Sequence, residues 1–165
     1  MTTILTRTLA VLSLASLVAS GPAFAQEPPD EIAGPVEARV VKVRDGDTIE
    51  VEAYIWPMQS VHVAVRLRGI DAPEKRGRCE AEKRAAAVAT ERLSELVASG
   101  RVTLSGIEGD KYFGRVLASV STEGTADVAK ELLKDGLVVR YGGKARLDWC
   151  SELSSIPAPT TRPKG

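Results

Sequence analysis

Apolar and polar positions alternate along three consecutive segments in the first half of the chain. Residues 36–43, 49–55 and 61–67 each follow this period of two, which is the pattern of a strand with one buried face. An Asp-Gly pair separates the first two segments, and Trp56-Pro57-Met58-Gln59 separates the second from the third. The pattern predicts three successive strands joined by tight turns.

A helical period replaces the alternation after this region. It predicts a helix from about Cys79 to Ser99, ended by Gly100. Its expected buried stripe is Ala85, Ala89, Leu93, Leu96 and Val97. Two further strands are expected at 101–107 and 115–121, and a second helix at about 126–135.

Five strands, with one helix between the third and fourth and another after the fifth, suit a small closed barrel. We therefore expect an all-β or α+β OB-fold barrel with two to three helices, a fold whose face commonly holds oligonucleotides. The expected domain spans residues 36–150. A flexible, proline-bearing leader at 26–35 precedes it, and a disordered tail rich in Pro, Thr and Ser follows at 151–165.

The first 25 residues have the features of a cleaved signal peptide. Arg7 supplies the positive region, Leu9 to Val18 is apolar, and Ala23-Phe24-Ala25 is a small-x-small cleavage site before Gln26. The apolar stretch is shorter than the roughly 20 residues that span a bilayer. We therefore expect a secreted or periplasmic protein, cleaved after Ala25, with no membrane attachment after cleavage.

The overall charge of the chain does not indicate a nucleic-acid-binding protein. The chain has 22 Lys and Arg against 22 Asp and Glu, and removal of Arg7 with the signal leaves 21 against 22, a net charge of −1. Nonspecific nucleic-acid binders usually carry a basic excess. The run Lys75, Arg76 and Arg78 either contributes to a local basic face or forms part of a solvated loop.

Cys79 and Cys150 are the only cysteines. An even count in an exported chain predicts a disulfide between them. That bridge would tie the segment after residue 74 to the C-terminal extension. The alternative is a pair of unrelated buried thiols.

Two short acidic runs carry the candidate chemistry, Asp45-Gly46-Asp47-Thr48 and Asp71-Ala72-Pro73-Glu74. Pro73 bars the helical conformation at Ala72, so the second run is an extended loop. Arg66 lies between the runs, and Arg115 follows later. Hard oxygens hold a divalent cation, a carboxylate polarises the attacking water, and planar guanidiniums meet a phosphate. Either run alone would equally indicate an ordinary turn.

Four stretches give the chain a resemblance to the staphylococcal nuclease (thermonuclease) family. The resemblance extends over residues 36–141, nearly the whole folded part. Its motifs are Val43 to Thr48, Val65 to Glu74, Tyr112 to Ala118 and Leu132 to Leu137.

The resemblance implies a Ca²⁺ site formed by Asp47, Asp71 and the backbone carbonyl of Ala72. The family usually has threonine at the last position, and a backbone ligand is indifferent to that change. The matching catalytic residues are Arg66, Glu74 and Arg115. Arg68 lies on the same strand face as Arg66, but the spacing of Arg66 to Asp71 matches the family.

The nucleotide-contacting aromatics depart from the family pattern. The loop Asp110 to Arg115 is one residue longer than in the family, so Phe113 takes the tyrosine position unless Tyr112 slides into it. Tyr141 is the one nearby choice for base stacking, with a plain core role as its alternative.

These observations predict an exported, monomeric, Ca²⁺-dependent endonuclease. Its expected substrates are DNA and RNA in single-stranded regions, and the family cuts the P–O5′ bond to leave 3′-phosphate ends. The alternative is a catalytically weak OB-fold nucleic-acid-binding module.

Overall fold

The computed structural model describes residues 30–155. Within this range the strands are β1 (Glu31–Ile32), β2 (Val36–Asp45), β3 (Thr48–Trp56), β4 (Gln59–Leu67), β5 (Ile70–Asp71), β6 (Arg101–Gly109), β7 (Arg115–Ser121) and β8 (Val139–Arg140). The helices are α1 (Glu80–Leu96), α2 (Val128–Lys134) and α3 (Trp149–Ser155).

Five long strands close into a barrel. Their order is β6-β2-β3-β4-β7, and pairing between β6 and β7 completes the circle. The β4–β7 pair is parallel and the other neighbours are antiparallel. Inward-facing residues such as Ile49, Val51 and Val65 are fully buried in one apolar core. The predicted five-stranded OB-type barrel is therefore confirmed, with three helices.

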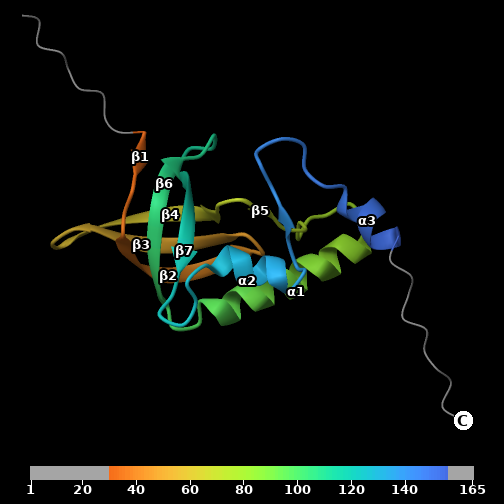
Figure 1. Cartoon of the computed structure of the whole chain (residues 1–165), viewed down its shortest axis with the longest axis horizontal. Helices are drawn as coiled ribbons and strands as arrows, with labels where there is room; N and C mark the ends of the chain where they lie inside the picture. The colour runs from red at the N-terminus through yellow and green to blue at the C-terminus, as the bar shows by residue number, and fades with distance from the viewer. Residues whose placement is uncertain (1–29, 156–165) are drawn as a thin grey trace, which may run out of the picture.

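Helices α1 and α2 cover one side of the barrel, and α3 lies beside the N-terminal end of α1 (Figure 1). Helix α1 buries Ala86, Ala89 and Leu93, so its inner face is rotated slightly from the predicted stripe. Ala85 and Leu96 are only half-buried, and Val97 is buried just beyond the helix end. Asp127 caps the N-terminus of helix α2, because its side chain accepts a hydrogen bond from the Lys130 amide at 3.1 Å.

A small two-stranded sheet links the barrel to the C-terminal segment. Gly69 has a φ of 81°, which glycine adopts without penalty, and it turns the chain from β4 into β5. Strand β5 then pairs with β8 through Ile70–Arg140 and Asp71–Val139. This pairing brings the chain that follows residue 140 next to the second acidic run.

Two boundary predictions need correction. The end of the expected flexible leader is strand β1, which pairs with β6 through Glu31–Glu108 and Ile32–Ile107. The start of the expected disordered tail is α3, because Trp149 is buried and Cys150 is covalently anchored. The signal peptide and the rest of the tail lie outside the described residues.

The predicted disulfide between Cys79 and Cys150 is present. It joins the residue before α1 to the first turn of α3, across a sequence separation of 71. No helix within residues 30–155 is long and apolar enough to cross a lipid bilayer.

Candidate active site

The first acidic run forms the tight turn between β2 and β3. The Asp45 carboxylate accepts a hydrogen bond from the Asp47 amide at 3.1 Å, which is the local bond that favours Asp in turns. The Asp47 carbonyl accepts from the Leu67 amide at 2.8 Å, so the turn is pinned to the end of β4. The Asp47 side chain is thereby held in the interior and is only 3% exposed.

The second acidic run begins on β5, directly beside that turn. Asp71 is fully buried, and the Ala72 amide donates to Asp47 Oδ2 at 3.2 Å. The two runs, distant in sequence, therefore meet at one point. Burial of two like-charged carboxylates requires a compensating positive charge.

Arg66 supplies that charge from the end of β4. Its Nη1 lies 2.6 Å from Asp47 Oδ2, and its Nη2 lies 3.1 Å from Asp71 Oδ1. The same Nη2 donates to the Ile70 carbonyl at 3.2 Å. One planar guanidinium thus bridges both carboxylates, a geometry that a lysine ammonium cannot reproduce.

Burial outweighs the positive charge of Arg66 at the Asp47 carboxylate. Burial, the largest cause, raises the pKa of Asp47 to about 7, and the charge of Asp45 adds to this while Arg66 opposes it. Two buried carboxylates and the adjacent Ala72 carbonyl form a set of hard oxygen donors. The residues therefore fit a hard divalent cation such as Ca²⁺, which takes carboxylate and carbonyl ligands in flexible geometry.

Glu74 lies two residues beyond the Ala72 carbonyl and is exposed to the cleft. Its loop is fastened by Glu82 of α1, which is only 7% exposed. The Glu82 carboxylate accepts from the Glu74 amide at 3.3 Å and from the Arg78 amide at 3.0 Å. The buried acid thus fixes the backbone that presents Glu74.

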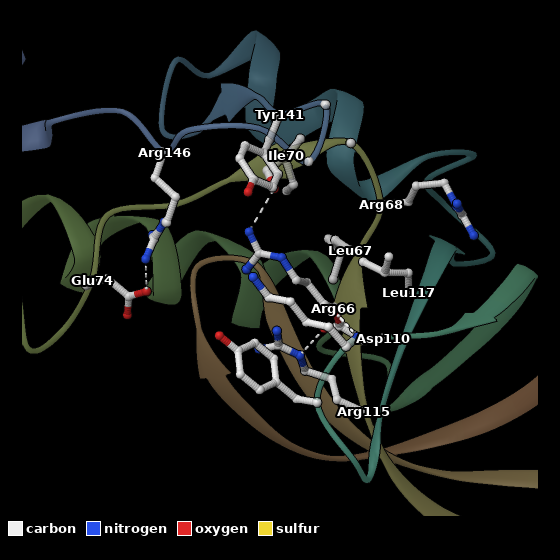
Figure 2. A pocket seen from close by; sticks show the side chains of 15 residues that line it. Arg66, Leu67, Arg68, Ile70, Glu74, Asp110, Arg115, Leu117, Tyr141 and Arg146 are labelled. Atoms are coloured by element: carbon white, nitrogen blue, oxygen red, sulfur yellow. Dashed lines mark hydrogen bonds and ion pairs between the residues drawn. The ribbon is translucent and has the colours of Figure 1, made fainter.

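Arg115 enters the cleft from the first residue of β7. Its Nε is paired with the Asp110 carboxylate, and its guanidinium lies 4.6 Å from the centroid of the Tyr112 ring. Figure 2 shows Arg115 and Arg66 reaching the same part of the cleft, whereas Arg68 points away. Arg68 is held instead by Glu108 at 3.1 Å and by the Gly106 carbonyl at 2.5 Å.

The aromatic residues separate into two groups. Tyr112 and Tyr141 line the cleft, and the Tyr141 ring centroid lies 5.8 Å from the Arg66 guanidinium carbon. Phe113 is fully exposed and does not line it. The extra loop residue therefore places Tyr112, rather than Phe113, in the cleft.

Three residues of this region were missed by the sequence analysis: Arg146, Trp149 and Glu82. Arg146 contacts both Asp71 and Glu74, and Trp149 Nε1 lies 3.4 Å from Asp71 Oδ2. The predicted disulfide held a signal for Arg146, because Cys79 follows Glu74 by five residues and Cys150 follows Arg146 by four. Pairing the cysteines therefore brings Arg146 and Glu74 into the same neighbourhood.

The cleft has a volume of about 500 Å³. Its lining carries more positive than negative side chains, although the chain as a whole is neutral. The positive residues are Arg66, Arg68, Lys111, Arg115 and Arg146, against Glu74 and Asp110. A concave cationic surface beside buried carboxylates suits a phosphate-bearing ligand near a cation.

The fold and site define an OB-type barrel whose cleft combines acidic cation ligands with arginines. The chain belongs to the family described as staphylococcal nuclease homologues, whose model matches residues 64–149, just over half of the 165 residues. The matched region contains every candidate catalytic and metal-ligating residue except Asp47.

Comparison with curated proteins gives relatives of the same kind. An Escherichia coli protein named "Uncharacterized endonuclease" is 36% identical over 110 residues, which cover 64% of this chain and 61% of the relative. The "Probable endonuclease LCL3" of Verticillium alfalfae is 33% identical over 105 residues, covering 62% of this chain and 36% of the relative. The matches thus span less than two thirds of either relative.

Proposed function

We propose that the protein is an exported, monomeric, Ca²⁺-dependent endonuclease that hydrolyses phosphodiester bonds of DNA and RNA, preferring single-stranded regions. Family membership and the names of the relatives support the nuclease class. The observation that carries the proposal is the bridge from Arg66 to Asp47 and Asp71, next to a cleft that Glu74 and Arg115 also line.

Each side chain has a role that follows from its position. Arg66 and Arg115 pair with the non-bridging phosphate oxygens, and their planar forks match those oxygens as negative charge builds in the transition state. Glu74, exposed to the cleft, accepts the proton of the attacking water or orients it. Asp47, Asp71 and the Ala72 carbonyl hold the cation. When bound, Ca²⁺ offsets the negative charge on the phosphate and acidifies water.

The preference for single strands rests on the walls of the cleft. Tyr112 and Tyr141 offer ring faces beside the arginines, and unpaired bases stack on such faces with little dependence on sequence. Bases in a duplex are already stacked on their neighbours. A single strand or a frayed end therefore makes better use of this cleft.

Export rests on the N-terminal sequence and fits the disulfide, since such bridges persist in oxidising compartments. We expect the protein recovered from a periplasmic or culture-medium fraction to begin at Gln26. N-terminal sequencing tests this, and an intact Met1 in that fraction would contradict it.

The nuclease proposal is tested with purified residues 26–165 and end-labelled single-stranded DNA and RNA. We expect internal cleavage in Ca²⁺, loss of cleavage in excess chelator, and recovery when Ca²⁺ is restored. Hairpin substrates should be cut mainly in the loop. Binding of the oligonucleotide without Ca²⁺-dependent cleavage would favour the nucleic-acid-binding module instead.

A further inference from the structure

The Arg146 side chain makes three contacts, all with one short stretch of chain. Its Nε lies 2.9 Å from Asp71 Oδ1, and its Nη1 lies 2.5 Å from Glu74 Oε1. Its Nη2 donates to the Ala72 carbonyl at 3.0 Å. Figure 2 shows the guanidinium directed at Glu74 from the irregular segment between β8 and α3. Every nitrogen of the guanidinium thus has an oxygen partner.

These three oxygen groups coincide with the proposed cation site and its neighbouring base. Asp71 and the Ala72 carbonyl are proposed ligands, and Glu74 is the proposed catalytic carboxylate. Oxygen lone pairs that accept from a guanidinium are not free to coordinate a cation. Two positive groups competing for the same buried carboxylate also repel each other strongly in this low-dielectric setting.

The approach of Arg146 is built into the fold. The Tyr141 amide donates to the Gly69 carbonyl at 2.9 Å, and the Tyr141 hydroxyl donates to the Lys144 carbonyl at 2.7 Å. Beyond Arg146, Asp148 pairs with Arg78 at 3.0 Å, and the disulfide follows at once. The segment is therefore held at both ends over the second acidic run. This distinguishes Arg146 from a surface arginine that meets a carboxylate by chance.

We propose that Arg146 is a further residue of the active site: an internal counter-cation that neutralises Asp71 and Glu74 in the metal-free protein and competes with the divalent cation for Asp71 and the Ala72 carbonyl. The proposal rests on the cation site of the proposed function. It implies that Arg146 lowers cation affinity while stabilising the empty acidic site. A residue that merely orients the ligands would have the opposite effect on affinity.

The test measures Ca²⁺ binding directly by isothermal titration calorimetry, with no nucleic acid present. Arg146→Met keeps much of the side-chain length but removes the charge and the donors. We expect it to bind Ca²⁺ about tenfold more tightly than the parent protein or better, the factor equal to about 1.4 kcal/mol. Arg146→Gln should also bind Ca²⁺ more tightly than the parent protein. It replaces Arg146→Met in the test if the methionine variant does not fold.

Arg68→Met is the matched control, because Arg68 lines the same cleft but touches none of the proposed ligands. Its Ca²⁺ affinity should change by less than about threefold, the modest effect of a single screened charge. An equal gain in this control would overturn direct competition, because the effect would then be one of general cleft charge.

Thermal unfolding supplies a second readout. Metal-free Arg146→Met should melt below the parent protein, and saturating Ca²⁺ should raise its melting temperature by more than it raises that of the parent. Unchanged or weaker Ca²⁺ binding in both Arg146 variants would overturn the inference, as would the absence of Ca²⁺ binding in the parent and both variants alike. If the parent protein cleaves DNA with Ca²⁺ but the Arg146 variants bind Ca²⁺ no more tightly than the parent, the nuclease proposal stands. Only the role proposed for Arg146 is then wrong.

Discussion

At the scale of single residues, the site is organised around Arg66. Asp47 and Asp71 are both buried, and each would be costly to ionise in the interior without a positive partner. Arg66 contacts both, and Thr48 adds a hydroxyl bond to Asp47 at 2.8 Å. No buried side-chain nitrogen or oxygen in residues 30–155 lacks a hydrogen-bond partner. The carboxylates are therefore placed before any ligand arrives.

Asp71→Asn is expected to abolish Ca²⁺-stimulated cleavage and to lower the free energy of unfolding by about 1–3 kcal/mol, because two guanidiniums lose a buried charged partner. Urea denaturation and cleavage assays measure the two effects. Asp45→Asn is the control, since an asparagine oxygen still accepts the Asp47 amide bond. Ca²⁺-dependent cleavage at the parent rate in Asp71→Asn would show that Asp71 is not a ligand.

Gly46 is needed for space rather than for backbone conformation. A Cβ at this position would meet the Ala89 Cβ at 2.7 Å and the Ala72 Cβ at 2.9 Å. Gly46→Ala should therefore destabilise the protein by about 1–3 kcal/mol through overpacking. Gly109→Ala, with nothing within 4 Å, should change stability far less. Equal melting temperatures for the two variants would refute this account of the turn.

The meeting of the two acidic runs could be predicted from sequence because strand ends fix their positions. Asp47 and Asp71 follow strands that the alternating pattern identifies, so their meeting is a consequence of barrel topology. Arg146 lies in an irregular segment with no period to place it, and its approach depends on long-range anchors. The net charge of the chain did not predict the cationic cleft, because it carries no information on where charged side chains gather in the fold.

At the scale of elements, the loop that carries Glu74 is held by the first turn of α1. Glu82 accepts hydrogen bonds from two backbone amides of this loop. A Cβ on Gly77 would lie only 2.5 Å from the Glu82 carboxylate, so glycine leaves the space for it. A glutamate on the buried face of a helix is rarely predicted from an apolar stripe. In the structure Glu82 lies on the same buried face as Ala86, Ala89 and Leu93.

Glu82→Ala is expected to lower the free energy of unfolding by about 1–3 kcal/mol, since the part-buried Glu74 and Arg78 amides lose their acceptor. It should also slow cleavage on the order of tenfold or more, because Glu74 loses its fixed position. Glu91→Ala, an exposed glutamate of the same helix, is the control. Urea denaturation and cleavage rates measure both, and a Glu82 variant that matches this control would contradict the assigned role.

Elements at the two ends of the described chain were the least predictable. Strand β1 has two exposed residues and no alternating pattern. It forms by pairing with Ile107 and Glu108 of β6, which lie beyond the part of β6 that pairs with β2. Helix α3 is short and depends on the buried Trp149 and on the disulfide. Both are formed by tertiary contacts, which local sequence patterns do not record.

At the scale of the whole molecule, a neutral chain concentrates positive charge in one cleft and keeps buried carboxylates beside it. The barrel supplies strand ends for Asp47, Arg66, Asp71 and Arg115, and the C-terminal segment closes the opposite wall. Five positive side chains line the cleft, so it can contact few phosphates. Screening by salt should therefore weaken binding only modestly compared with a strongly basic nuclease.

Hydrolysis in the cleft is tested most directly by single-turnover cleavage of one single-stranded oligonucleotide. Equilibrium binding of an uncleavable analogue is measured beside it, on the parent protein, Arg66→Lys, Arg115→Lys and Glu74→Gln. We expect Ca²⁺-dependent turnover in the parent and losses of about 10²-fold or more in each arginine variant, because lysine keeps the charge but not the planar fork of donors. Glu74→Gln should slow turnover yet bind the analogue at least as well. Near-zero turnover in all four proteins, with the arginine variants losing only affinity, would show that the cleft binds nucleic acid without cleaving it.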